Sequence, residues 1–146
     1  MMKLKTFLSV LMVYYSNFKV LHWMAEGEAF FTLHDKAEEY ANMLLEDMDT
    51  VGEICLRSNE GIVNYIEALK AIEDDENHEF LLINSSEMYD IDKFKANASK
   101  MFNDILACIK ALLEEGIDNV GIKAALETMY DKYDLQVNYL LKRFND

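Results

Sequence analysis

The sequence lacks the residues that usually interrupt helices. Its 146 residues include no proline and only five glycines. Proline and glycine break helices and form turns, so their scarcity excludes a linker-rich or collagen-like chain and favours long helices. The length suits one domain, which we take to span residues 1–146, with a substantial buried core.

Cysteine is also scarce, and no apolar run is long enough to span a membrane. Cys55 and Cys108 each fall on an apolar helical stripe, which indicates buried thiols in a reducing compartment and no disulfide framework or zinc knuckle. The apolar residues near the N-terminus are periodic, and no small-x-small cleavage site follows them. We therefore expect a cytoplasmic protein with no signal peptide and no membrane contact.

Positive charge is in short supply. Fourteen Lys and Arg residues face 27 Asp and Glu residues, which gives a net charge of −13. Lys3 and Lys5 are too few to act as a basic arm. Such a balance opposes contact with nucleic-acid phosphates, so DNA binding is not expected, but it attracts cations.

The apolar residues recur at alternating steps of four and three, the pattern of helices that face a bundle core. Four long helices show it, and residues 62 to about 74 predict a short helix in the connection between the second and third. The stripes are Leu4, Leu8, Leu11, Tyr15, Phe18 and His22; Ala37, Ala41, Leu44, Met48, Val51 and Cys55; Phe94, Ala98, Met101, Ile105, Cys108 and Leu112; Ile122, Leu126, Met129, Tyr133, Val137, Leu140 and Phe144. The long connection predicts an all-α, ferritin-like four-helix bundle in which the second and third helices run parallel.

Metal-binding residue types share one face of the second helix. His34, Glu38, Asp49 and Glu53 fall within a sector of about 100°. They form two pairs with i, i+4 spacing, at which two side chains can reach one ion. Fifteen residues separate the pairs, about 22 Å along a helix, and no glycine or proline between positions 35 and 51 folds the helix back. One straight helix therefore cannot unite them.

A symmetric dimer would unite them. If the helix pairs antiparallel with its copy about a two-fold axis near residue 43 or 44, each His34 and Glu38 face the partner's acidic pair. His22, on the inward stripe of the first helix, would complete a set of two imidazoles and three carboxylates. Such a set suits Fe(II) and also accepts Mn or Zn. The alternative is a solvated face on a metal-silent scaffold or interaction protein.

The same stretch resembles the signature of the Dps-type mini-ferritins. It has His22-Trp23, then Gly27, Leu33-His34 and the acids Glu38, Asp49 and Glu53 at that family's spacing. The resemblance implies a ferroxidase that oxidises Fe(II) with hydrogen peroxide or oxygen and stores or detoxifies iron in a dodecameric shell. It assigns His22, His34 and Glu38 to one subunit and Asp49 and Glu53 to its two-fold mate, with Trp23 in a possible supporting role.

Other features complete the set of candidates. Glu114, Glu115 and Asp118 would line an acidic pore if a shell forms, although an ordinary acidic turn is the alternative. Asp75 and His78 indicate a solvated loop. The chain departs from the family signature in having Gly52-Glu53-Ile54 where Ala-Glu-Arg is common, and in lacking a lysine-rich tail.

Overall fold

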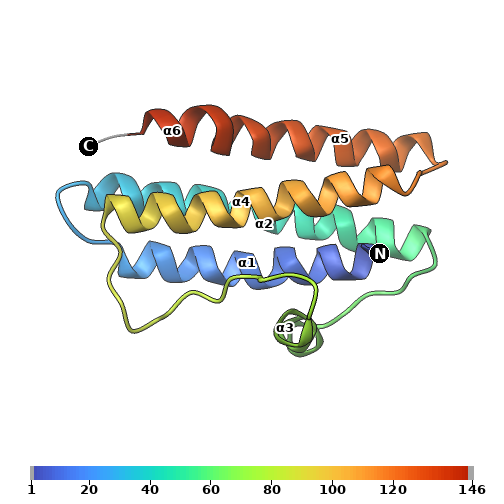
Figure 1. Cartoon of the computed structure of the whole chain (residues 1–146), viewed down its shortest axis with the longest axis horizontal. Helices are drawn as coiled ribbons and strands as arrows, with labels where there is room; N and C mark the ends of the chain where they lie inside the picture. The colour runs from blue at the N-terminus through green and yellow to red at the C-terminus, as the bar shows by residue number, and fades with distance from the viewer. Residues whose placement is uncertain (1, 145–146) are drawn as a thin grey trace.

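The computed structural model describes residues 2–144, and Figure 1 shows helices packed side by side. The helices are α1 (Leu4–Met24), α2 (Phe30–Arg57), α3 (Tyr65–Asp74), α4 (Ile91–Glu114) and α5 (Val120–Leu135), followed by η1 (Gln136–Leu140) and α6 (Leu141–Arg143).

The long helices form two antiparallel pairs, α1 with α2 and α4 with α5–α6 (Figure 1). α2 and α4 run in the same direction, so the chain must travel the length of the bundle between them. This is the parallel arrangement of the second and third long helices that the sequence predicts. The buried apolar faces of all four helices meet in one core, with Phe7, Phe18, Leu44, Phe102 and Tyr133 fully buried.

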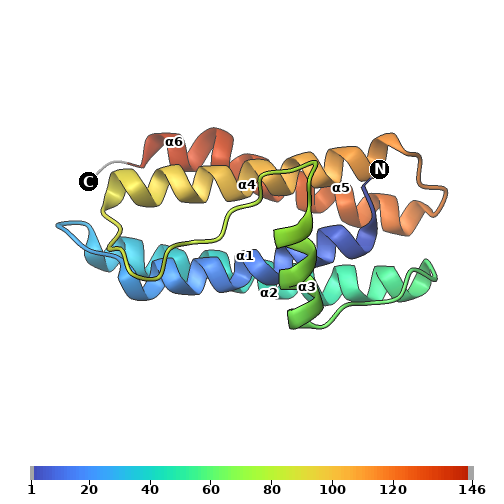
Figure 2. The same cartoon turned by 60° about the horizontal axis from the view of Figure 1, so that its bottom comes forward.

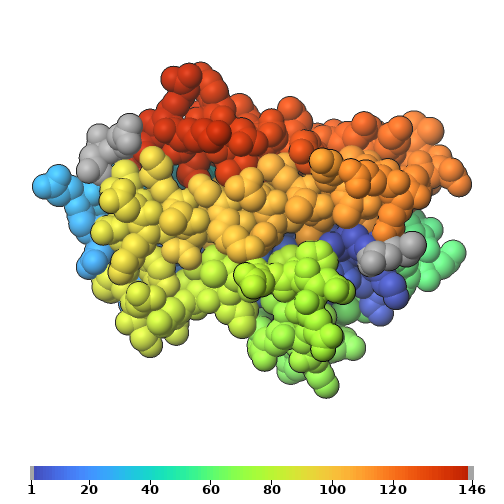
Figure 3. Space-filling model, in the orientation of Figure 1, coloured from blue at the N-terminus to red at the C-terminus, as the bar shows by residue number. Residues whose placement is uncertain are grey.

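The connection between α2 and α4 runs across the outside of α1. In Figures 1 and 2, α3 lies across the bundle and the following segment runs along α1 toward the start of α4. Asn17 of α1 holds that segment, because its amide donates to the Leu81 carbonyl at 2.7 Å and its oxygen accepts from the Ile83 amide at 3.2 Å. Figure 3 shows the connection covering one side of the molecule.

The helix ends follow the expected capping chemistry. Asn64, Asp90 and Asn119 each accept a hydrogen bond from a backbone amide in the first turn of α3, α4 and α5. Gly27 has a φ of 97°, which permits the tight turn between α1 and α2. That turn is tied to the end of the connection, because the Tyr89 amide donates to the Met24 carbonyl at 2.8 Å.

The fold prediction is confirmed, and so is the short helix in the connection, which begins at Tyr65. The last helix differs in detail: it contains a π-helical turn at Gln136–Leu140 and ends at Arg143. None of the described helices is long and apolar enough to cross a membrane.

Candidate metal centre

Two histidines from neighbouring helices lie face to face at one end of the bundle. His22 is in the last turn of α1 and His34 is in the second turn of α2. Their ring centroids are 3.7 Å apart, with 21° between the ring planes. Phe30 packs against the His34 ring at 5.3 Å. The structure therefore brings together two of the five residues that the sequence predicts as ligands.

Each of these histidines hydrogen-bonds to the backbone of the other. Nδ1 of His22 donates to the carbonyl of His34 at 2.6 Å, and Nδ1 of His34 donates to the carbonyl of His22 at 2.8 Å. A carbonyl oxygen only accepts, so in both rings the proton sits on Nδ1. Nε2 then carries a lone pair in each ring, which is the form of imidazole that binds a metal.

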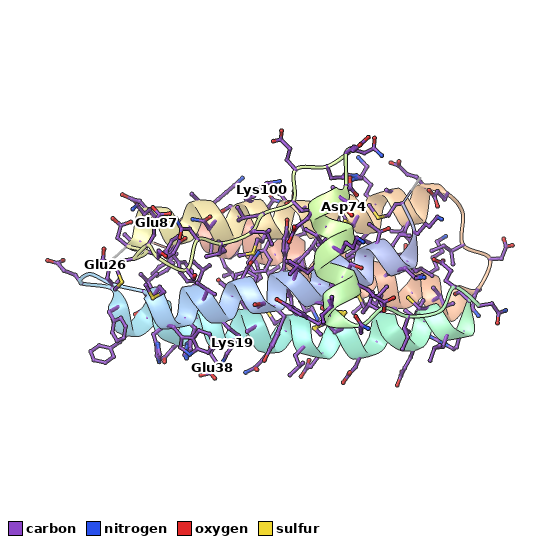
Figure 4. All side chains as sticks on the ribbon, turned by 90° about the horizontal axis from the view of Figure 1, so that it is seen from below. Lys19, Glu26, Glu38, Asp74, Glu87 and Lys100 are labelled. Atoms are coloured by element: carbon purple, nitrogen blue, oxygen red, sulfur yellow. The ribbon has the colours of Figure 1, made fainter. Side chains whose placement is uncertain are left out.

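Glu38 lies one turn beyond His34 on α2, and its carboxylate faces a lysine. The Lys19 ammonium of α1 is 3.7 Å from Glu38 Oε1, and 25% of the Lys19 side chain is exposed. The same ammonium is 5.8 Å from the centroid of the Trp23 ring. Figure 4 shows Lys19 and Glu38 close together on the α1–α2 side of the bundle. Within one chain, this carboxylate therefore has a lysine ammonium as its neighbour.

Asp49 and Glu53 are surface residues near the other end of α2. Because α2 is continuous from Phe30 to Arg57, they stand about 22 Å from the histidines along the helix axis. Within residues 2–144, no three His, Cys, Asp or Glu side chains of the single chain are grouped to hold a metal ion. The structure thus separates the five residues into two groups, with His22 of α1 beside the α2 residues His34 and Glu38, and with Asp49 and Glu53 near the other end of α2.

The same face of α2 also carries exposed apolar side chains, which are not among the predicted ligands. Phe31 is 79% exposed, Leu45 is 43% exposed and Leu56 is 59% exposed. At 100° per residue they fall in the sector that contains Glu38 and Asp49. Exposed apolar residues in line with the acids were the sequence signal that this face is more than a solvated one.

Gly52 and Ile54, where the chain departs from the Dps signature, occupy different surroundings. Ile54 is fully buried in the bundle core, on the side of α2 opposite the acids. A Cβ atom at Gly52 would meet no atom of another helix within 4 Å. Within this chain, Ile54 therefore acts as a core residue.

The remaining candidates lie elsewhere. Glu115 and Asp118, at the turn between α4 and α5, line a hollow of about 600 Å³ together with Lys3 and Lys5, while Glu114 borders neighbouring surfaces. Their expected role in a pore depends on assembly and stays a prediction.

Asp75 and His78 form a local turn in the connection. His78 Nδ1 is 3.1 Å from Asp75 Oδ1, which also accepts from the His78 backbone amide at 2.9 Å. Burial raises the pKa of Asp75, but hydrogen bonds from His78 and from the Asn77 backbone outweigh it, so the pKa lies below its usual value. The pair is accounted for by the turn.

Comparison with known proteins gives a sharp contrast between sequence and structure. No protein-family model matches the chain, and no curated protein sequence is similar to it. Solved structures, in contrast, match over nearly its whole length. A Dps protein from Vibrio cholerae aligns with a TM-score of 0.80 at 22% identity, covering 95% of this chain and 84% of that one.

A Dps protein from Bacillus brevis aligns with a TM-score of 0.81 at 19% identity, covering 95% of this chain and 89% of that one. Antigen TpF1 from Treponema pallidum aligns with a TM-score of 0.82 at 17% identity, covering 94% and 85%. This chain has the fold of the Dps proteins. The Vibrio cholerae protein is described as a member of a broad superfamily of ferritin-like diiron-carboxylate proteins.

Proposed function

We propose that the protein is a mini-ferritin that oxidises Fe(II), with hydrogen peroxide as the electron acceptor, at a site shared by two copies of the chain. His22, His34 and Glu38 of one copy and Asp49 and Glu53 of the other would bind the iron. The observation that carries the proposal is the paired histidines, whose Nδ1 atoms are both engaged by backbone carbonyls.

The histidine pair is preorganised for metal binding. Two reciprocal hydrogen bonds fix both rings and leave both Nε2 lone pairs available; metal-binding imidazoles are commonly oriented by such a bond from the other ring nitrogen. The two rings are stacked with their centroids 3.7 Å apart, so the two imidazoles lie next to each other at the same end of the bundle. Imidazole with carboxylate suits iron, and Mn or Zn can occupy a similar donor set.

The exposed face of α2 is complementary to itself. Consider two copies of α2 that lie antiparallel, related by a two-fold axis midway between Met43 and Leu44. Each exposed apolar residue at one end then faces an apolar residue of the other copy, and each α2 candidate ligand faces another candidate ligand. The exchanged pairs are Phe31 with Leu56, His34 with Glu53, Glu38 with Asp49, and, beside the midpoint, Asn42 with Leu45. An antiparallel two-fold pairing therefore joins apolar contacts at both ends and places each histidine group opposite an acidic group.

The facing carboxylates in this pairing would require a cation between them. Glu38 would face the partner's Asp49, and two carboxylates repel unless a positive charge lies between them. In the single chain Lys19 partly supplies that charge. In the pair, Fe(II) would bind the facing carboxylates, while the net charge of −13 draws cations to the surface.

A larger closed shell, such as a dodecamer, would give the oxidised iron a place to collect. Glu114, Glu115 and Asp118 form an exposed acidic turn between α4 and α5. If copies of this turn meet around a symmetry axis, they would form an entry path for Fe(II).

The proposal is tested by adding Fe(II) and then peroxide while following the ferric absorbance in the near ultraviolet. The wild-type protein should oxidise iron, and the variant His34→Asn/Asp49→Asn should lose most of this activity. Asparagine keeps a donor for the His22 carbonyl but removes the ligand nitrogen. The matched control is His78→Asn, outside the site, which should oxidise iron as the wild type does. Unchanged oxidation in the double variant would overturn the proposed site, whereas absence of oxidation in the wild type would support a metal-silent scaffold.

A further inference from the structure

A buried tyrosine in the core makes a directional hydrogen bond that the iron site does not use. Tyr14 of α1 is fully buried, and its hydroxyl donates to Oδ2 of Asp104 on α4 at 2.6 Å. The amide of Leu81 in the connection donates to the same phenolic oxygen at 2.9 Å. A phenol has one proton to donate. Because Leu81 can only donate, the hydroxyl proton must point at Asp104.

The carboxylate is placed to receive that proton. Its other oxygen, Oδ1, accepts from the Lys100 ammonium at 2.7 Å, which leaves Oδ2 for the tyrosine. The side chain of Asp104 is 18% exposed, so a proton that it accepts can pass on to solvent. Figure 4 shows Lys100 on the side of α4 that borders the connection. Asp104 can therefore accept the Tyr14 proton and release it to solvent.

Tyr14 is also in line with the histidines. Tyr14, Phe18 and His22 follow one another at steps of four residues on α1, so their side chains lie on one side of the helix. The span from Tyr14 to His22 is about 12 Å along the axis. The Phe18 ring, between them, packs on Phe102 at 5.3 Å and on Tyr40 at 5.5 Å. Aromatic side chains therefore fill the path between the tyrosine and the candidate metal centre.

We propose that Tyr14 is a redox-active tyrosine that supplies one electron to peroxide when a single Fe(II) occupies the site, and passes its proton to Asp104. This inference rests on the proposed function, which supplies the oxidant. Reduction of one peroxide takes two electrons, and one Fe(II) gives only one of them. The net reaction converts Fe(II), peroxide and the tyrosine into Fe(III), one hydroxide, one water and a neutral tyrosyl radical.

The atoms and charges balance in that reaction. The O–O bond of peroxide breaks, iron and tyrosine are each oxidised by one electron, and peroxide is reduced by two. The phenolic O–H bond of Tyr14 breaks as an O–H bond forms on Asp104 Oδ2. Asp104 then returns its proton to solvent, and a proton from solvent forms the water. The radical remains next to the same two partners, Asp104 and the Leu81 amide.

The surroundings favour loss of electron and proton together. Burial and the hydrogen bond to Asp104 raise the pKa of Tyr14 well above its usual value, so the phenol stays protonated until it is oxidised. Burial likewise raises the pKa of the neighbouring Cys108 thiol to about 12, which keeps that sulfur protonated and a poor competitor.

The test places a fluorinated tyrosine at position 14, which keeps the hydroxyl and its structural bonds. Protein carrying difluorotyrosine at Tyr14 is mixed with less than one Fe(II) per site and excess peroxide, frozen rapidly and measured by electron paramagnetic resonance. We expect a tyrosyl radical signal split by fluorine. Difluorotyrosine at Tyr139, which is exposed, is the matched control and should give an unsplit signal.

A second arm separates the inference from the proposed function. Metal-free protein carrying difluorotyrosine at Tyr14 is oxidised by a photo-generated ruthenium(III) complex, with and without Asp104→Asn. We expect a radical signal split by fluorine, and we expect its yield to be at least tenfold lower in the Asp104→Asn variant. Ferric absorbance without a split signal overturns the tyrosine inference alone. Absence of ferric absorbance overturns the proposed function, and the photochemical arm then decides whether Tyr14 is redox-active.

Discussion

Lys19 is the residue that a metal ion would have to displace from Glu38. Its ammonium is 3.7 Å from the Glu38 carboxylate, and the Glu38 side chain is 51% exposed. A half-exposed ion pair contributes little to stability, so its main effect here is competition for the carboxylate. The sequence offered one signal for it, a lysine three residues before His22, on the same side of α1.

Replacing that lysine should strengthen metal binding. In Lys19→Met the competing charge is gone, and we expect Co(II), as a stand-in for Fe(II), to bind about two- to fivefold more tightly, in proportion to the usual strength of such pairs. Isothermal titration calorimetry measures the change. Lys36→Met, which removes a lysine paired with Glu39 at 2.8 Å, is the control and should bind as the wild type does. Weaker binding in Lys19→Met would mean that Lys19 supports the site.

Asp47 is a buried carboxylate whose partners come from the opposite end of the sequence. Only 5% of it is exposed, and it accepts from the Tyr133 hydroxyl and from Lys132 at 2.9 Å. Burial, followed by the charge of Asp47, raises the pKa of Tyr133 well above its usual value, so this hydroxyl stays a donor. The three residues tie α2 to α5.

Removing Asp47 should therefore cost much stability. Asp47→Ala leaves a buried hydroxyl and a partly buried ammonium without their acceptor, and we expect the free energy of unfolding to fall by about 3–5 kcal/mol. Urea denaturation followed by circular dichroism measures it. Asp131→Ala, an exposed change on the same helix as Tyr133, should stay within about 0.5 kcal/mol of the wild type. If the two variants were equally stable, the hydrogen bonds of Asp47 would contribute no net stability, and the prediction would be wrong.

At the scale of elements, the connection between α2 and α4 depends on polar side chains from α1. Asn17 and Tyr14 satisfy backbone groups of residues 81–83, so this non-helical segment stays close to the bundle without a sheet. The connection in turn covers α1 and meets the turn that precedes the His34 helix.

Asn17→Ala should loosen this connection and leave the helices in place. It removes two hydrogen bonds from partly buried backbone groups, and we expect a loss of about 1–3 kcal/mol. Relative to the wild type, amide hydrogen exchange should become faster at residues 79–84, while the exchange rates of α4 should change little. Asn103→Ala, exposed on α4, is the matched change and should leave both rates as they are. Uniform acceleration over the whole chain would contradict a local role.

The elements were largely predictable from the sequence because helix-forming faces repeat locally. The four stripes extend over most of the length of the four long helices. The π-helical turn within the last helix was not predictable, since Gln136–Leu140 contains no helix breaker.

The contacts within the bundle were not predictable in the same way. Tyr14 and Asp104 are 90 residues apart, and Asp47 and Tyr133 are 86 apart, so no local pattern connects them. The ligand set could be proposed because its residues repeat on one helix. The proposed completion of the set by a second chain was inferred from the distance between its two groups, and the contacts across such a pairing could not be predicted from the sequence.

At the scale of the whole molecule, the exposed face of α2 should be the surface through which two copies associate. Leu45 lies near its centre, is 43% exposed and would lie beside the partner's Asn42 in the proposed pairing. In Leu45→Asp the new carboxylates of the two copies would stand only about 4.5 Å apart along the helix axis, in a contact that excludes water. We therefore expect native mass spectrometry to show dissociation of the pair, and iron oxidation to be lost.

The matched change is Leu135→Asp on α5, where the side chain is 48% exposed. This variant should keep both the pairing and the oxidation of iron, because its new charge lies on another helix. A Leu45→Asp protein that remains paired would place the contact elsewhere.

Subunit mixing tests the shared site most directly. One variant carries His22→Asn/His34→Asn and the other Asp49→Asn/Glu53→Gln, so each alone lacks half of every site. The two are mixed at equal concentration, unfolded and refolded together, and assayed for Fe(II) oxidation with peroxide. Each mixed pair contains one intact site, so we expect activity to rise from background to about a quarter of the wild-type value. Activity that stays at background in mixed pairs, verified by native mass, would contradict a site built from two chains.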